Sequence, residues 1–253
     1  HGLVCLICCS GITFSALKTT YTDLHISSDV THVSPGQKAY LNIRFNHKKG
    51  WYSYWLNPGD SGLATSVQWQ TPKGIKADPI IWPGPTRHSL GSLINFGYKE
   101  TLDLLIPITI SPDTALGSYE LKGTLSWLVC KDICIPEQIE FNYPIHVQKS
   151  TKPSDEFTSI HERLKNRSWP ELTGTFTLTK ETIIIKLEHN QDIKTQPIYF
   201  FPLQTNKLAY HKQQQFDLHD NTLTLTLPRN EATTTSFNEI SGLLKLNQHD
   251  YVH

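Results

Sequence analysis

The chain has 253 residues, enough for one large or two ordinary domains, and its 23 basic side chains balance its 23 acidic ones. This neutral balance argues against the basic surface with which proteins bind nucleic acids, so no nucleic-acid partner is expected. Three of the five cysteines lie within the first nine residues, and the other two, Cys130 and Cys134, lie together near the middle of the chain.

Residues 1–17 resemble a secretory signal peptide whose true start is missing. Positions 2–17 carry no charge, begin with an apolar run and end in small residues suited to cleavage. These 16 residues fall short of the roughly 20 needed to span a bilayer. We therefore expect export to the periplasm and loss of Cys5, Cys8 and Cys9 with the signal.

Residues 18–149 are predicted to form an immunoglobulin-like β-sandwich. Period-two alternation or a preceding turn marks strands at 39–45, 123–129 and 139–147, and turn sequences lie at 57–60 and 82–85. In the first of these turns, Asn57, Asp60 and Ser61 could contact a partner, but turn chemistry is sufficient to explain them. Short strands separated by proline and glycine are typical of a sandwich.

Residues 150–170 are predicted to be a linker with one short helix. Phe157, Ile160 and Leu164 have helical spacing, with Ser154 as the expected N-cap and Asp155 and Glu156 in the first turn. Residues 171–253 are predicted to form a second, smaller sandwich, with strands at 174–179, 182–187, 197–201, 222–227 and 242–246. The expected fold class is all-β, with two immunoglobulin-like sandwiches joined by this linker.

The cysteine pair is the feature that points to chemistry. Alternation on both sides makes residues 131–133 the tip of a hairpin-like connection, with Cys130 and Cys134 facing each other. Closing so small a ring stabilises a fold by only about 2 kcal/mol, so stability alone does not explain the pair. Disulfide exchange needs one thiol that attacks and a second that resolves the mixed intermediate, which favours a redox role. Lys131 would lower a thiol pKa, whereas Asp132 and Glu137 would raise it.

Two alternatives remain open at this point. A copper site on a β-sandwich would need further His or Met ligands; Met is absent, and only a distant histidine such as His88 or His146 could complete the shell. A noncatalytic adhesion or assembly module would use the disulfide only as a structural bridge. A measured reduction potential separates this module from an exchanging pair, and a thiolate charge-transfer band would reveal copper.

Four motifs in order resemble one known family. They are GWYSYWLNPGDSG at 50–62, WPGP at 82–85, NFGY at 95–98 and WLVCKDICIP at 127–136. Together they resemble the periplasmic N-terminal region of DsbD/ScsB-type thiol:disulfide interchange proteins, on the ScsB side. The resemblance runs from about residue 24 to residue 147, and the region after it is only weakly similar to the second extracytoplasmic domain of that group.

The resemblance implies a protein-disulfide reductase without a cofactor other than its redox-active disulfide. Cys130 and Cys134 would cycle between dithiol and disulfide, with Cys134 preferred as the attacking residue. Electrons would come from a membrane-linked, thioredoxin-like donor and pass to thioredoxin-like periplasmic proteins and disulfide isomerases, a chemistry connected with cytochrome c biogenesis. A membrane electron-transfer domain is expected after residue 253, which would place the full-length protein in the inner membrane.

The resemblance also implies an aromatic shell around the cysteines. Tyr52 and Tyr54 match positions that line the cysteine pocket in the family. Residues 87–98 occupy the place of a loop that caps the disulfide, so Phe96 or Tyr98 is expected to shield it. On that basis, replacing either ring with alanine should speed the reaction with small thiols and change stability little.

Overall fold

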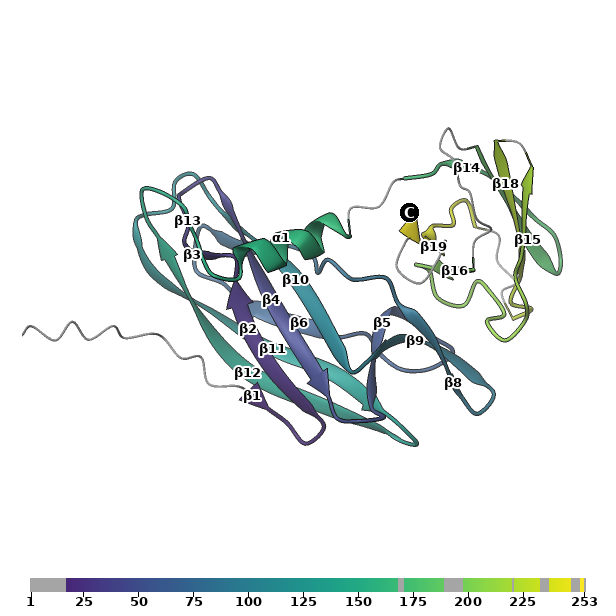
Figure 1. Cartoon of the computed structure of the whole chain (residues 1–253), viewed down its shortest axis with the longest axis horizontal. Helices are drawn as coiled ribbons and strands as arrows, with labels where there is room; N and C mark the ends of the chain where they lie inside the picture. Colours follow the sequence, from purple (N-terminus) through teal and green to yellow (C-terminus); the bar gives the residue numbers. More distant parts are fainter. Residues whose placement is uncertain are drawn as a thin grey trace, which may run out of the picture.

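The computed structural model describes residues 17–167, 171–188, 198–219, 221–232, 237–246 and 251–252. The described chain forms two β-sandwiches of unequal size, with one helix between them in the sequence (Figure 1). This confirms the all-β prediction. The predicted signal peptide falls almost wholly outside the described residues; Leu17, its last position, pairs with Leu24 in the first sheet.

The large domain is built from two main sheets. One contains, in spatial order, β1 (Leu17–Lys18), β2 (Thr22–Ser28), β4 (Lys38–His47), β10 (Thr101–Ile110) and β7 (Ile75–Ala77). The other contains β12 (Cys134–Val147), β11 (Gly117–Cys130), β5 (Tyr52–Gly59), β9 (Leu93–Lys99) and β8 (Thr86–Leu90), with β6 (Ser66–Gln70) paired to β11. A short pair, β3 (Val30–His32) and β13 (Lys152–Pro153), lies beside them.

The core lies between these two sheets, where alternate residues of each strand meet. Leu41, Ile43 and Phe45 of β4 are fully buried, as are alternate residues of β11. The ring of Phe45 meets Trp127 edge to face at 5.4 Å, which joins one sheet to the other. The alternation predicted at 39–45 and 139–147 therefore reflects strands with one face in the core.

The helix α1 (Phe157–Lys165) begins later than the sequence suggests. Glu156 occupies the N-cap position, and its backbone N–H donates to the hydroxyl of Ser154 at 3.1 Å. Asp155 and Glu156 therefore precede the helix, which corrects the prediction that they form its first turn. Ser154 is therefore not the N-cap, which corrects that prediction as well; its hydroxyl closes the turn before the helix. In the described part of the chain, no helix is long and apolar enough to cross a membrane.

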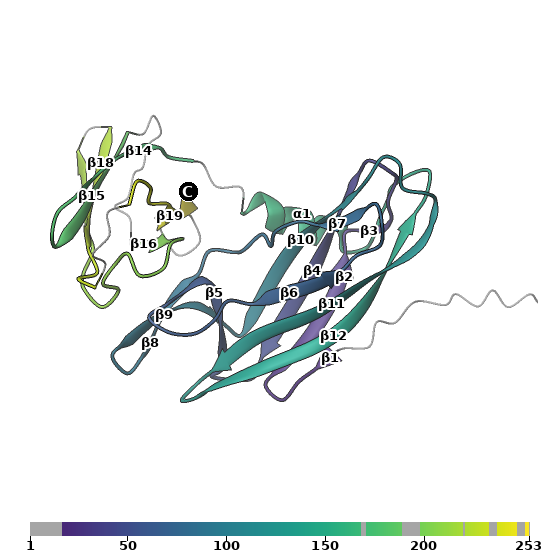
Figure 2. The ribbon, with the colours of Figure 1, turned by 180° about the vertical axis from the view of Figure 1, so that it is seen from behind.

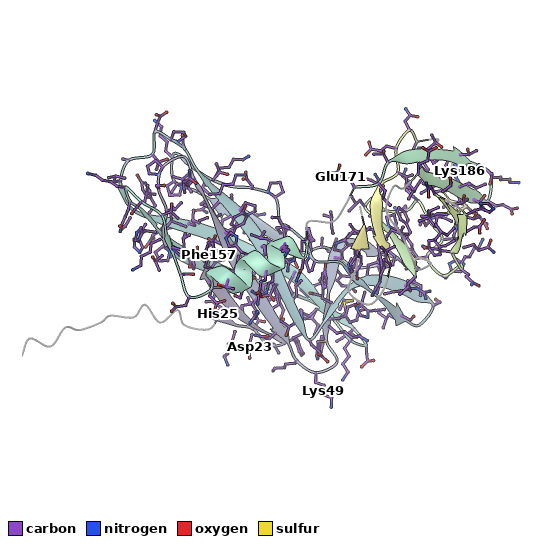
Figure 3. The ribbon with its side chains drawn as sticks, turned by 45° about the horizontal axis from the view of Figure 1, so that its top comes forward. Asp23, His25, Lys49, Phe157, Glu171 and Lys186 are labelled. Carbon is purple, nitrogen blue, oxygen red and sulfur yellow. A yellow bond between two sulfur atoms is a disulfide. The ribbon has the colours of Figure 1, made fainter. Side chains whose placement is uncertain are left out.

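The helix packs on the large domain rather than standing free as a bridge. Ile160 is fully buried, and the Arg163 guanidinium donates to Asp103 of β10 at 3.1 Å. Asp103 also accepts from Arg44 of β4 at 2.9 Å. Figure 3 shows Phe157 at the start of the helix on this domain, whereas Glu171 and Lys186 lie on the small domain.

The small domain has a four-stranded and a three-stranded sheet. The first contains β14 (Gly174–Leu178), β15 (Thr182–Glu188), β18 (Thr222–Pro228) and β17 (Gln215–His219), and the second contains β16 (Tyr199–Pro202), β19 (Gly242–Lys245) and β20 (Tyr251–Val252). The sequence predicts five of these strands and misses β17 and β20. Buried Ile183, Leu225 and Phe200 contribute to the core of this domain.

The small domain rests on β5 and on the β8–β9 hairpin of the large one (Figure 2). Asn57 of β5 is fully buried, and its amide donates to the carbonyl of Pro202 at 2.8 Å and to the hydroxyl of Tyr210 at 3.2 Å. Its side-chain carbonyl accepts from the Gly59 N–H, but residues 57–59 are the end of β5, which corrects the turn predicted at 57–60. Asn57 therefore makes both a local contact and the contact between domains.

Candidate redox site

The two cysteines close the end of the longest hairpin in the described structure. Strand β11 ends at Cys130, β12 begins at Cys134, and the two residues are paired in register and joined by a disulfide. The same register runs without a break to the pair Gly117 and Val147 at the other end. The predicted hairpin and the facing positions of the cysteines are confirmed.

The two sulfur-bearing residues differ in exposure. Cys130 is completely buried, whereas Cys134 is exposed, as is the whole tip at 131–133. Cys134 is therefore the residue of the pair that an incoming thiolate can reach from solvent. The sulfur of Cys130 is the leaving group in such an attack.

The hydroxyl of Tyr54 lies against both sulfurs. It donates a hydrogen bond to Cys130 Sγ at 2.8 Å and lies 3.2 Å from Cys134 Sγ. Burial raises the pKa of Tyr54 well above its ordinary value, so the hydroxyl keeps its proton at neutral pH. Gly62, whose φ is +105°, lies against the ring, and a Cβ at this position would overlap it. The loop around Gly62 thus covers the ring from one side.

Tyr52 forms the next layer of the site. It is paired in register with Cys130, and its ring lies 5.4 Å from the ring of Tyr54 and 5.2 Å from that of His88. Its hydroxyl accepts a hydrogen bond from the Asn95 amide at 3.2 Å. The family resemblance implies both tyrosines, whereas the contacts of His88 and Asn95 with Tyr52 could not be predicted, because these two residues come from strands distant in sequence from β5.

Phe96 and Tyr98 lie on the opposite face of the sheet, which corrects the expected cap. Tyr98 is paired with Ser53, whereas the residues paired with Tyr52 and Tyr54 are Lys99 and Gly97. Because successive side chains of a strand point to opposite faces, the even positions of β9 face away from the disulfide. Phe96 packs on the small domain, 5.0 Å from the Phe201 ring, and the Tyr98 hydroxyl donates to the carbonyl of Pro83.

Glu137 also points away from the sulfurs. It is paired with Trp127, whose side chain faces the core, and its carboxylate accepts from the Tyr21 N–H and the Thr22 hydroxyl, each at 2.8 Å. The expectation that Glu137 raises a thiol pKa is therefore corrected. Lys131 and Asp132 remain exposed at the tip beside the disulfide.

The two histidines considered for copper lie apart from each other. His146 is paired with Ser118, near the end of the hairpin that is far from the cysteines, whereas His88 contacts Tyr52. Within the described ranges, no group of three or more His, Cys, Asp or Glu side chains is placed to hold a metal ion.

His88 makes the stability of the site dependent on pH. Burial, with Lys99 nearby, lowers its pKa from 6.5 to about 4. The unfolded chain therefore binds a proton between these two values that the folded chain does not bind. The contribution of His88 to the free energy of unfolding is fully present above about pH 6.5. It is lost as the pH falls toward 4, which lowers the free energy of unfolding by about 3 kcal/mol.

Urea unfolding at several pH values from 7.5 to 4 measures this loss. His88→Gln keeps a polar side chain but removes the titration, so its free energy of unfolding should fall less steeply over this range than that of the unsubstituted chain. An equal slope in both proteins would contradict the assignment.

Comparisons with known proteins agree with this geometry. Residues 25–143 match the family described as the N-terminal region of the thiol:disulfide interchange protein DsbD. The crystal structure of the N-terminal periplasmic domain of ScsB from Proteus mirabilis has the same fold, with a TM-score of 0.64 and 16% identity over 92% of each chain. A family 123 glycoside hydrolase from Clostridium perfringens aligns with a TM-score of only 0.29 and 14% identity, over 51% of this chain and 28% of its own.

No curated protein sequence matches the chain. The family match nevertheless spans β4, β5, β9 and β11, together with most of β12, and so includes the disulfide, both tyrosines and the hairpin that carries His88. Over residues 25–143 the sequence therefore matches the N-terminal region of the thiol:disulfide interchange protein DsbD, and the chain has the fold of the ScsB N-terminal periplasmic domain.

Proposed function

We propose that the chain exchanges thiols and disulfides with thioredoxin-like proteins and disulfide isomerases of the periplasm, through the Cys130–Cys134 pair. The observation that supports this most directly is the unequal exposure of the two cysteines beside a protonated tyrosine. A purely structural bridge has no need of one reachable sulfur and one covered sulfur. The family match to thiol:disulfide interchange proteins supports the same reaction class.

In the reducing half-reaction, the thiolate of a thioredoxin-like donor attacks Cys134 Sγ. The bond between Cys130 and Cys134 breaks, Cys130 leaves as a thiolate, and the hydrogen bond from Tyr54 stabilises its charge. A second donor thiol then attacks the mixed disulfide, so the donor leaves oxidised and this chain holds two thiols.

In the second half-reaction, the Cys134 thiolate attacks the disulfide of an acceptor. One acceptor sulfur leaves as a thiolate and the other remains bonded to Cys134. Cys130 then attacks this mixed disulfide, which restores the Cys130–Cys134 bond and releases a reduced acceptor. Two electrons thus pass from donor to acceptor, and no cofactor other than the cysteine pair takes part.

Trapping of the mixed disulfide tests the proposal. Cys130→Ala removes the resolving thiol, so this variant should accumulate an adduct with an oxidised thioredoxin-like periplasmic protein, reversible by dithiothreitol. Cys134→Ala removes the attacking thiol and should give little adduct. Non-reducing gels and mass spectrometry of the intact adduct provide the measurement.

The opposite outcome, with an adduct only in Cys134→Ala, would exchange the roles of the two cysteines. Failure of both variants to form an adduct, with a partner that reacts with a control dithiol, would refute exchange and leave the structural bridge.

A further inference from the structure

An apolar groove lies on the outer face of the sheet that carries the disulfide. Its volume is about 400 Å³, and Leu63, Ala64, Leu128 and Pro136 contribute its apolar wall. The uncharged polar residues Ser66, Ser126 and Gln138 of β6, β11 and β12 also line it, together with Trp127 and Glu137. We call this feature the β6–β11–β12 groove.

The strand register connects this groove directly to the disulfide. Along the hairpin, Cys130 is paired with Cys134, and two positions further Leu128 is paired with Pro136. Side chains two positions apart lie on the same face, about 6.6 Å apart along the strand. Leu128 also packs against the cluster formed by Tyr52, Tyr54 and Cys130. The groove therefore lies next to the disulfide, on the same face of the sheet.

The groove and its rim expose apolar side chains, and the one carboxylate in the lining is hydrogen-bonded to other groups. Leu63, at the rim, is 66% exposed, and Ile133, at the hairpin tip, is 63% exposed. The one ionisable residue in the lining, Glu137, has both carboxylate oxygens engaged by the Tyr21 N–H and the Thr22 hydroxyl. An apolar groove that begins two positions along the hairpin from a reactive disulfide is suited to bind another molecule.

We propose that the β6–β11–β12 groove holds the extended, apolar peptide segment that flanks the reactive cysteine of a redox partner. This inference rests on the proposed exchange at Cys134. Once the partner sulfur reaches Cys134, a side chain two residues from the partner cysteine lies level with Leu128 and Pro136, because extended chains advance at the same rate as the strands below them. An apolar side chain there loses water contact, whereas a charged one would be desolvated without a counter-ion.

Two synthetic peptides of equal length provide the test. Each contains one cysteine, flanked in one peptide by leucines and in the other by asparagines, so neither carries a charge near its thiol. The oxidised protein is mixed with each peptide and quenched with iodoacetamide. Mass spectrometry then measures the product in which the peptide is bonded to Cys134 and Cys130 is alkylated. We expect the leucine peptide to react about tenfold faster than the asparagine peptide.

Leu63→Glu is the informative variant, since Leu63 is largely exposed and its replacement leaves the core intact. It should reduce the tenfold preference to about twofold or less while the rate with dithiothreitol stays unchanged. Leu116→Glu is the matched control. Leu116 is 52% exposed and directly precedes β11 at the end of the strand opposite to Cys130, so this variant should keep the full preference.

Equal rates of the two peptides with the unsubstituted protein would overturn the groove proposal while leaving exchange at Cys134 intact. The same conclusion follows if Leu63→Glu keeps the preference. Absence of reaction with both peptides and with dithiothreitol would overturn the exchange reaction itself, and the groove proposal with it.

Discussion

Replacing Phe96 with alanine is expected to lower the free energy of unfolding by about 3–5 kcal/mol, the usual cost of removing a fully buried phenylalanine. The Phe96 side chain is completely buried. Its ring lies among aromatic rings of both domains, 4.9 Å from Tyr210, 5.0 Å from Phe201 and 6.5 Å from Trp55. The cavity left by the substitution would therefore open in the contact between the two sandwiches.

The same substitution should leave the reaction of the disulfide with dithiothreitol within about twofold of the original rate, because Phe96 and the sulfurs lie on opposite faces of the sheet. Urea unfolding measures the stability and stopped-flow mixing measures the rate. Leu93→Ala serves as a control on the same strand, since Leu93 is 40% exposed and its loss should change stability little. A faster reaction in Phe96→Ala, with stability unchanged, would restore the capping role implied by the family resemblance.

The face of β9 on which Phe96 and Tyr98 lie could not be predicted from the sequence. The motif NFGY at 95–98 resembles the family, but the resemblance does not say whether the even or the odd positions of this strand face the disulfide. That choice depends on the pairing of β9 with β5, where Gly97 is opposite Tyr54 and Tyr98 is opposite Ser53. A shift of one residue in register would exchange the faces. The sequence alone carries no information on this long-range pairing.

The features that could be predicted are those set by local pattern. Alternation on each side of the cysteines was sufficient to predict the hairpin and the facing positions of Cys130 and Cys134. The second role of Asn57 could not be predicted in this way, because its partners Pro202 and Tyr210 lie about 150 residues further along the chain. The inward orientation of Glu137 follows from the same alternation, but its hydrogen bonds to Tyr21 and Thr22, more than 100 residues earlier, could not be predicted.

The start of the helix also depends on contacts between distant parts of the chain. Asp155 and Glu156 favour a first turn by their charge, yet the helix begins at Phe157. The Ser154 hydroxyl donates to the carbonyl of Ser28, and the Ser154 N–H donates to the carbonyl of Asp29. These tertiary hydrogen bonds hold the chain at the edge of the large sandwich, so the helix begins two residues later than the sequence predicts.

Removing the hydroxyl of Tyr54 should make the disulfide harder to reduce. The hydroxyl donates to Cys130 Sγ, and this hydrogen bond strengthens when the sulfur leaves as a thiolate, because bonds to charged acceptors are stronger than bonds to neutral ones. A net loss of about 1.5–3 kcal/mol on the reduced side corresponds to a reduction potential lower by about 30–60 mV. The rate of attack on Cys134 by dithiothreitol should fall about tenfold, since part of the charge is already present in the transition state.

Tyr54→Phe keeps the ring that packs against Gly62 and Tyr52, so the fold around the sulfurs is retained. Tyr119→Phe is the matched control on β11: its hydroxyl donates to the carbonyl of Ala115 at the opposite end of the strand, and its loss should change neither quantity. Equilibration with glutathione buffers measures the potential, and stopped-flow mixing measures the rate. If Tyr54→Phe keeps both values, the hydroxyl only fills space beside the sulfurs, and the unequal exposure of the two cysteines alone directs attack to Cys134.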